Sequence, residues 1–305
     1  MNSILITTST FAQFDNRPLE MIQKAGYSYV LNEYKRKLSE NEILSLIEKI
    51  QPVGLIAGVE PITPRVLEKA KNLKAISRCG IGMDSIDIEA ASKHAIQVIN
   101  TPDAPTIAVA ELTLGLILAA LRNISFIHSN IQKKKWLRPM GHLISDKTVG
   151  IIGCGRIGSY LARLLSSFNC TVLGYDIRNN KNDNYVWVEL DELYKRSDII
   201  TIHIPYTRSK EHFINRNTFS CIKKGAILIN TSRGGLIDED VLYEMLQSKY
   251  LGGAAIDCFE HEPYTGRLIE LDNIILTSHI GSYAVESRIM MEKQSVDNLL
   301  QLLGA

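Results

Sequence analysis

The chain has 305 residues, of which 45% are hydrophobic, and its 34 Lys and Arg against 33 Asp and Glu give a formal net charge of +1. This length and apolar content are typical of two globular domains, each with its own core. The near-zero charge excludes a global attraction to nucleic acid or to an anionic membrane, so we expect neither as a partner and look for a local small-molecule site.

The cysteines give a first indication of the compartment. There are five of them, widely scattered and never in CxxC spacing. This pattern argues against a disulfide framework and against a structural zinc site, so we predict no metal and a reducing cytoplasm.

The first residues lack the basic region and the cleavage site of a signal peptide. We therefore expect them to form a strand.

The first hundred residues alternate short apolar runs, at 4–6, 53–57, 75–77 and 96–99, with helical patterns. Thr63-Pro64 is typical of a helix start, with Thr63 as the N-cap and Pro64 in the first turn. Such alternation predicts a parallel α/β unit. The apolar stretch 107–121 contains Glu111 and is shorter than a membrane span, so we predict a buried helix there.

A second series of apolar runs begins at Thr148. Strands are predicted at 148–153, 171–175, 199–204, 226–230, 254–257 and 274–277, with a helix at about 157–168. Strands and helices in this order are typical of a doubly wound parallel sheet. A last helix, at about 285–303, lies beyond the final strand, and we expect it to pack back on the first domain.

A glycine-rich turn follows the first strand of this second series. Gly153, Gly155 and Gly158 form GxGxxG between the strand and the helix that starts near 157. Glycines at this spacing permit a tight turn and close approach of the backbone to a pyrophosphate, while the helix N-terminus supplies amide donors. Asp176 ends the next strand, where a carboxylate binds the ribose hydroxyls and repels the phosphate of NADP, so we predict NAD despite the nearby Arg178.

Three more polar residues follow later strands of the same sheet. Arg233, Glu262 and His279 come after the strands that end near 230, 257 and 277. Each taken singly has an ordinary structural explanation. Because ligands of doubly wound sheets bind at the carboxyl ends of the strands, the three together predict an active site.

These residue types suit the reduction of a 2-keto acid. Hydride goes to the carbonyl carbon and a proton to its oxygen, and His279 is the acid that titrates nearest neutrality. A neighbouring Glu262 stabilises the imidazolium form. Arg233 binds the substrate carboxylate and polarises the keto oxygen.

With these residues in place, the chain resembles the D-2-hydroxyacid dehydrogenase family, in particular its phosphoglycerate dehydrogenase-like branch, over nearly its whole length. The resemblance rests on seven segments: 77–84 (SRCGIGMD), 100–102 (NTP), 110–113 (AELT), 153–158 (GCGRIG), 230–235 (NTSRGG), 257–263 (DCFEHEP) and 279–281 (HIG).

The resemblance implies two doubly wound domains with a cleft between them. Residues 1–98 and 285–305 form a flavodoxin-like substrate domain, and residues 99–284 form a Rossmann coenzyme domain. It also implies a homodimer that packs through the coenzyme domain, with the helix 107–121 as a contributor.

The resemblance further assigns binding residues. The amides of Ile81 and Gly82 hold the substrate carboxylate, and Asp257 binds the nicotinamide carboxamide. The remaining cofactor contacts that it implies are Arg156, Ile157, Ile204, Pro205, Thr231, Ser232, His279 and Gly281.

Two departures bear on the substrate. Relatives that act on phosphoglycerate often carry arginine after the second strand, where this chain has Glu60, so Arg78 is the one obvious cation near the substrate loop. Phosphoglycerate therefore stays open beside glyoxylate, hydroxypyruvate and D-lactate. The second departure is Ser278, which replaces the usual proline before His279.

No C-terminal regulatory domain is expected after Ala305. We therefore expect no feedback control by serine through such a domain.

Two competing interpretations concern other proteins that bind dinucleotides. L-specific lactate and malate dehydrogenases place the glycine turn near the N-terminus, whereas here it starts at Gly153, after a complete α/β unit. That interpretation is rejected. A non-catalytic NAD(H)-sensing protein, similar to the corepressors that resemble this family, stays open, and turnover decides between them.

Overall fold

The structure is a computed structural model that describes residues 2–179 and 182–305. The chain forms two compact units, Met1–Pro105 with Ser282–Ala305, and Thr106–Gly281. These limits differ by a few residues from the boundaries expected at 98/99 and 284/285. Residues 99–105 finish the last strand of the first sheet and its loop, so the chain leaves the first unit only where the next helix begins.

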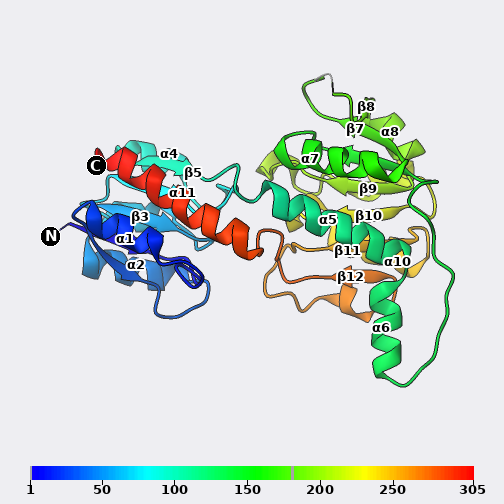
Figure 1. The fold of residues 1–305 in the computed structure, drawn as a ribbon, viewed down its shortest axis with the longest axis horizontal. Helices are drawn as coiled ribbons and strands as arrows, with labels where there is room; N and C mark the ends of the chain where they lie inside the picture. The colour runs from blue at the N-terminus through cyan, green and yellow to red at the C-terminus, as the bar shows by residue number, and fades with distance from the viewer. Residues whose placement is uncertain (1, 180–181) are drawn as a thin grey trace. The chain divides into compact units, whose positions relative to one another are not determined.

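The first unit is a five-stranded parallel sheet covered by helices on both faces (Figure 1). Its strands lie in the order β2-β1-β3-β4-β5, which is the flavodoxin-like order. The strands are β1 (Ser3–Ile6), β2 (Ser28–Leu31), β3 (Gly54–Ala57), β4 (Ala75–Arg78) and β5 (Gln97–Asn100). The helices are α1 (Arg17–Lys24), α2 (Glu40–Ile50), α3 (Pro64–Lys69), α4 (Ile88–Lys93) and α11 (Val285–Leu303).

Two apolar layers stabilise this unit. Helices α2, α3 and α4 cover one face of the sheet and pack on it through side chains such as Ile43, Ile47 and Leu67. Helix α1 and the C-terminal helix α11 cover the other face, through Ile22, Val296 and Leu299. The chain thus returns after the second unit to complete the first, because the second face would otherwise expose apolar strand residues to water.

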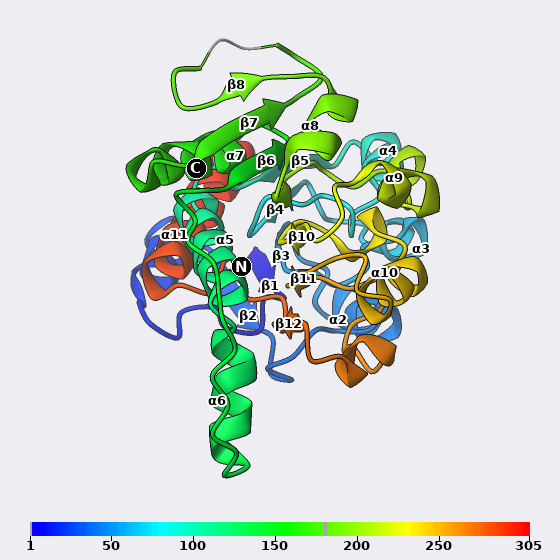
Figure 2. The same cartoon turned by 90° about the vertical axis from the view of Figure 1, so that its right-hand side faces the viewer.

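The second unit is a seven-stranded parallel sheet in the order β12-β11-β10-β9-β6-β7-β8 (Figure 2). The strands are β6 (Thr148–Ile152), β7 (Thr171–Tyr175), β8 (Val186–Trp187), β9 (Ile199–Ile202), β10 (Ile227–Asn230), β11 (Gly253–Ile256) and β12 (Ile274–Leu276). The α-helices are α5 (Thr106–Leu121), α6 (Ile124–Gln132), α7 (Arg156–Leu165), α8 (Leu190–Arg196), α9 (Arg216–Cys221) and α10 (Glu239–Gln247). Short 3-10 turns are η1 (Ser166–Phe168), η2 (Arg208–Lys210), η3 (Gly234–Leu236) and η4 (Arg267–Glu270).

Helices cover both faces of this sheet as well. Helices α5 and α7 pack on one face, and α8, α9 and α10 pack on the other. The strand order reverses between β6 and β9, which are neighbours in the sheet but not in sequence. A ligand site is expected at the carboxyl ends of the strands beside such a reversal, where the glycine turn after β6 lies.

The predicted α/β class with two parallel sheets is confirmed. The strand 171–175 and the helix 285–303 have the predicted bounds, and other predicted strands differ by one or two residues at their ends. Strands β2 and β8 were not predicted. Both lie at the edges of their sheets and are partly exposed, so neither has the continuous apolar run of a central strand.

Helix α6 projects from the rest of the second unit, and the chain returns beside it without regular structure (Figures 1 and 2). Among the described residues, no single helix has the length and apolar character of a membrane span, although α5 and α6, bent by 66° at their junction, meet both criteria as a pair.

Candidate active site

The turn after β6 has the geometry that a dinucleotide phosphate requires. Gly153 has φ +96°, a conformation that side chains disfavour, and a Cβ on Gly158 would lie 2.1 Å from the carbonyl oxygen of Gly153. Helix α7 starts directly after Gly155 and has no acidic residue in its first turn. Its amide groups and dipole therefore suit an anion.

Asp176 extends from the end of β7 toward the same turn. Its Oδ2 accepts a hydrogen bond from the backbone N–H of Cys154 at 2.8 Å, and its Oδ1 accepts one from the N–H of Arg178 at 3.3 Å. The carboxylate is thereby positioned beside the glycine turn, where it can accept hydrogen bonds from a ribose. The residues present thus fit NAD.

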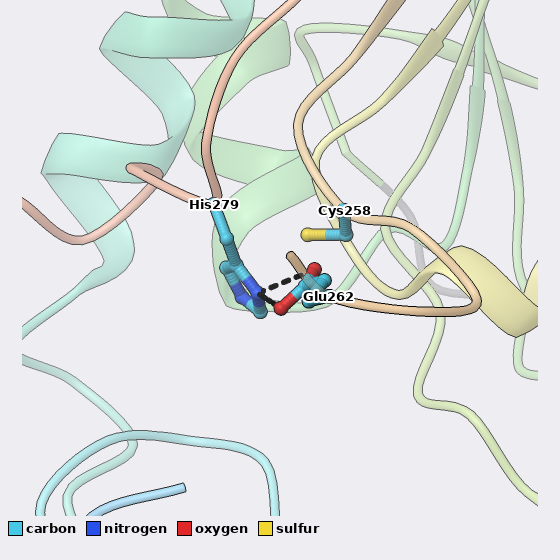
Figure 3. Close-up of side chains that lie close together, drawn as sticks. All are labelled: Cys258, Glu262 and His279. Carbon is cyan, nitrogen blue, oxygen red and sulfur yellow. Dashed lines mark hydrogen bonds and ion pairs between the residues drawn. The ribbon is translucent and has the colours of Figure 1, made fainter. Parts of the chain in front are cut away.

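His279 and Glu262 form a direct pair beyond the ends of β12 and β11 (Figure 3). Nδ1 of His279 lies 3.0 Å from both carboxylate oxygens of Glu262. The two side chains are 35% and 34% exposed, so a ligand can reach the pair. A carboxylate on Nδ1 stabilises the imidazolium and directs the other ring nitrogen, Nε2, away from Glu262.

Asp257 holds the segment that carries His279. Its Oδ1 accepts hydrogen bonds from the Thr277 hydroxyl at 2.6 Å and from the N–H of Ile280 at 2.9 Å, while its Oδ2 accepts one from the N–H of Gly281 at 2.9 Å. The side chain is completely buried. These bonds stabilise the backbone on both sides of His279, whose own φ is 56°. This positioning role was not predicted, although an Asp directly after a buried strand signals a need for such donors.

Arg233 follows β10 and is half-buried. Its Nη1 donates to the carbonyl oxygen of Ser232 at 2.8 Å, and Nδ2 of Asn230 donates to the carbonyl oxygen of Arg233 at 2.9 Å. A Cβ on the next residue, Gly234, would lie 1.9 Å from the carbonyl carbon of Phe259. The loop of Arg233 therefore packs directly against the loop that carries Glu262, and only glycine permits that approach.

The other predicted cofactor residues line the same edge of the sheet. The Ser232 hydroxyl donates to the carbonyl oxygen of Ile202, and the buried Thr231 hydroxyl lies 2.9 Å from that of Thr113 on α5. A methyl group of Ile204 packs against the glycine turn, 2.9 Å from where a Cβ of Gly153 would stand. Two of these predicted cofactor residues lie at the surface: Arg156 in the first turn of α7 and Pro205 after β9. Ile157 is half-buried.

The predicted substrate loop belongs to the first unit. The buried Arg78 donates from Nε to the carbonyl oxygen of Gly82 at 3.1 Å and from Nη1 to that of Cys79. Asn100 donates to the carbonyl oxygen of Ile81 at 2.7 Å. The guanidinium of Arg78, expected as a cation for the substrate, thus stabilises the loop around Ile81 and Gly82.

Comparisons with known proteins agree with this geometry. The family model of the NAD binding domain of D-isomer specific 2-hydroxyacid dehydrogenases matches residues 114–281. The chain belongs to the D-isomer specific 2-hydroxyacid dehydrogenase family. The dehydrogenase is accordingly an NAD-dependent oxidoreductase, and its matched residues lie in the second unit.

Two curated relatives cover most of the dehydrogenase. It is 37% identical to the hydroxypyruvate reductase of Thermotoga maritima, over 88% of this chain and 89% of the relative. It is 41% identical to the D-3-phosphoglycerate dehydrogenase of Methanocaldococcus jannaschii, over 82% of this chain but 49% of the relative. The dehydrogenase thus matches about half of that second relative.

Solved structures show the same fold. The D-lactate dehydrogenase of Aquifex aeolicus, crystallised with NAD and lactic acid, superposes with a TM-score of 0.86 at 28% identity, over 99% of the dehydrogenase and 95% of that chain.

Proposed function

We propose that the dehydrogenase interconverts a small 2-keto acid and its D-2-hydroxy acid with NADH, and that His279, Glu262 and Arg233 are its catalytic residues. The observation that carries the proposal is the contact of both Glu262 oxygens with His279 Nδ1 at 3.0 Å, at the strand ends of the sheet that carries the glycine turn. An imidazole held in this way is oriented to act as a general acid.

In the reduction, the glycine turn after β6 and Asp176 would hold NADH, which would supply the hydride that the carbonyl carbon takes up. His279 donates the proton on Nε2 to the keto oxygen, which becomes the hydroxyl group. Glu262 on Nδ1 stabilises the charged ring before the transfer and fixes its orientation. In the oxidation, the neutral ring takes the hydroxyl proton at Nε2, so the same pair serves both directions.

Arg233 binds the carboxylate of the substrate. A guanidinium presents paired N–H donors that match a carboxylate, and its charge also stabilises negative charge that develops on the keto oxygen. The packing of Gly234 on Phe259 supports this role, because it keeps the loop of Arg233 beside the loop of Glu262.

Among substrates, we favour an unphosphorylated acid such as hydroxypyruvate or glyoxylate. The hydroxypyruvate reductase of Thermotoga maritima is matched over 89% of its length. In the first unit, the buried carboxylate of Glu60 accepts a hydrogen bond from the N–H of Gly58 at 2.9 Å, which makes this loop unfavourable for a phosphate. Phosphohydroxypyruvate is the second candidate, favoured by the 41% identity to a phosphoglycerate dehydrogenase.

We further propose that residues 1–98 with 285–305 bind the substrate acid and that 99–284 bind the coenzyme. The separate cores of the two units and the glycine turn in the second support this division.

We also propose that the protein works in a reducing cytoplasm. The free thiols of Cys154, beside the glycine turn, and Cys258, beside the catalytic pair, support this location.

A homodimer through the second unit is the proposed assembly. The projecting segment formed by α6 and residues 133–143 exposes large apolar side chains, with Trp136 at 80%, Met140 at 91% and Leu143 at 63%. A single copy leaves this surface in water, whereas a second copy would bury it. Light scattering should give a dimer for the wild type and a monomer for Trp136→Glu with Met140→Glu; a wild-type monomer contradicts the proposal.

The decisive experiment follows NADH absorbance with purified protein and a panel of glyoxylate, hydroxypyruvate, pyruvate and phosphohydroxypyruvate, in parallel with NADPH. We expect turnover with NADH, fastest with one of the unphosphorylated acids. Fastest turnover with phosphohydroxypyruvate would transfer the assignment to the second candidate. Tight NADH binding without turnover of any acid would favour the NAD(H)-sensing protein.

A further inference from the structure

The catalytic pair has a third neighbour that the proposed reaction does not use. A ligand atom from each of Cys258, Glu262 and His279 lies within 4.8 Å of the other two. In Figure 3 the sulfur of Cys258 points toward the side of Glu262 that faces His279. One thiol, one carboxylate and one imidazole are thus gathered around a common point.

From this cluster we infer a binding site for a thiophilic divalent cation, Zn²⁺ or Cd²⁺, whose occupation inhibits the enzyme. Sulfur, imidazole nitrogen and carboxylate oxygen are the ligand atoms that zinc takes in proteins, at about 2.0 to 2.3 Å from the metal. Three such ligands with one open position fit the present spacing after a closure of roughly 1 Å. The sequence predicted no metal because the cysteines lack CxxC spacing, whereas folding brings these residues together.

The ligands are already held in place. The N–H of Phe259 donates to Glu262 Oε1 at 3.1 Å, and Glu262 in turn contacts Nδ1 of His279. Asp257 stabilises the backbone after His279 through Ile280 and Gly281. A site with preorganised ligands loses little conformational freedom when a metal binds.

The exposures favour reversible occupation. Cys258 is 1% exposed, but the side chains of Glu262 and His279 are about one third exposed, so a cation can enter from their side. Binding replaces the contact between Glu262 and Nδ1 by two bonds to the metal, and both the proton on Nδ1 of His279 and the thiol proton of Cys258 go to solvent. A ring bound to the metal through Nδ1 can no longer alternate between its charged and neutral forms, so proton transfer stops.

Only the inhibition rests on the proposed function, and binding can be measured without turnover. Co²⁺ is the probe for binding, because a cobalt–thiolate bond gives a characteristic near-ultraviolet charge-transfer band. We expect the wild type to show this band and Cys258→Ser and Cys258→Ala to lack it. Cys221→Ala, which removes an exposed thiol, should keep the band.

For inhibition, Zn²⁺ is titrated into the NADH assay. We expect wild type and Cys221→Ala to lose activity and to recover it with EDTA, and Cys258→Ala to require at least about tenfold more Zn²⁺, because one of three ligands is lost. Equal sensitivity of wild type and Cys258→Ala, or a wild type without the cobalt band, would overturn the inference. A cobalt band in a protein without turnover would instead contradict the proposed function alone.

Discussion

The two units share one architecture but use the polar residues at their strand ends differently. In the first unit, Glu60, Arg78 and Thr101 are buried and bond to nearby backbone: Glu60 accepts from Gly58, Arg78 donates to Gly82, and Thr101 accepts from Gly80. In the second, the buried Asp257 is satisfied in the same way, but Glu262 and His279 pair with each other while a third of each side chain stays exposed. A polar residue satisfied inside the fold contributes stability, whereas one left accessible is available for chemistry.

The largest expected effect is on kcat, and it tests whether the accessible pair of the second unit is catalytic. His279→Gln removes the acid but keeps a polar side chain, so kcat should fall by about a hundredfold to ten-thousandfold. NADH affinity, measured by fluorescence, should stay close to that of the wild type. His261→Gln, at an exposed position near Glu262 in sequence, is the matched control and should keep its activity. A His279 variant with near-normal kcat would exclude this residue as the acid.

Glu262→Gln should have the next largest effect. The amide keeps the shape of the side chain but loses the charge that stabilises the imidazolium, a contribution of about 1.5 to 3 kcal/mol. This corresponds to a loss of kcat of roughly tenfold to a hundredfold. Steady-state kinetics beside Glu260→Gln, an exposed glutamate of the same loop, provide the check. Equal losses in the two variants would point to a general disturbance of the loop.

The third change addresses the first unit. Glu60→Ala removes two hydrogen bonds to a buried carboxylate, one from the N–H of Gly58 and one from the hydroxyl of Thr7, so the free energy of unfolding should fall by about 1 to 3 kcal/mol. Each donor keeps a second acceptor: the hydroxyl keeps the carbonyl oxygen of Ile56, and the N–H keeps the Thr7 oxygen. Urea denaturation measures the loss of stability against Glu68→Ala, at an exposed position on α3. Should Glu60→Ala keep full stability and instead change KM, the carboxylate acts on the substrate and the contrast between the units fails.

The smallest effect concerns pH and a residue that sequence reasoning passed over. Burial lowers the pKa of His203 from 6.5 to about 3, and its Nδ1 is buried without a hydrogen-bond partner among the described residues. In the unfolded chain the imidazole of His203 therefore binds a proton below about pH 6.5, whereas in the folded chain it binds one only below about pH 3. The neutral, buried ring of His203 thus contributes its full share of the stability above the pKa of the unfolded state. This share decreases as the pH falls from the unfolded-state pKa to the folded-state pKa.

At about pH 5 the lost stability amounts to at most about 2 kcal/mol. His203→Gln removes the titrating ring, so its unfolding free energy should fall less steeply than that of the wild type between about pH 7.5 and pH 5. Urea denaturation at the two pH values tests this. Parallel slopes would show that His203 is protonated in the folded protein at mildly acid pH.

The sequence by itself determined much of this protein. Apolar runs of three to six residues with helical spacing between them predicted the central strands, because a strand covered on both faces must be apolar throughout. The glycine turn at 153–158 and the placement of Arg233, Glu262 and His279 after strands also followed from local pattern, since parallel strands bring their carboxyl ends to one edge.

Tertiary structure alone decided which polar groups are available. Nothing in the sequence shows that Arg78 is turned inward onto its own loop, that Asp257 is occupied by three donors around His279, or that Cys258 lies beside the catalytic pair. The edge strands β2 and β8 likewise appeared only in the fold. Patterns report the average burial of a segment, whereas the role of a single side chain depends on donors and acceptors that distant loops bring to it.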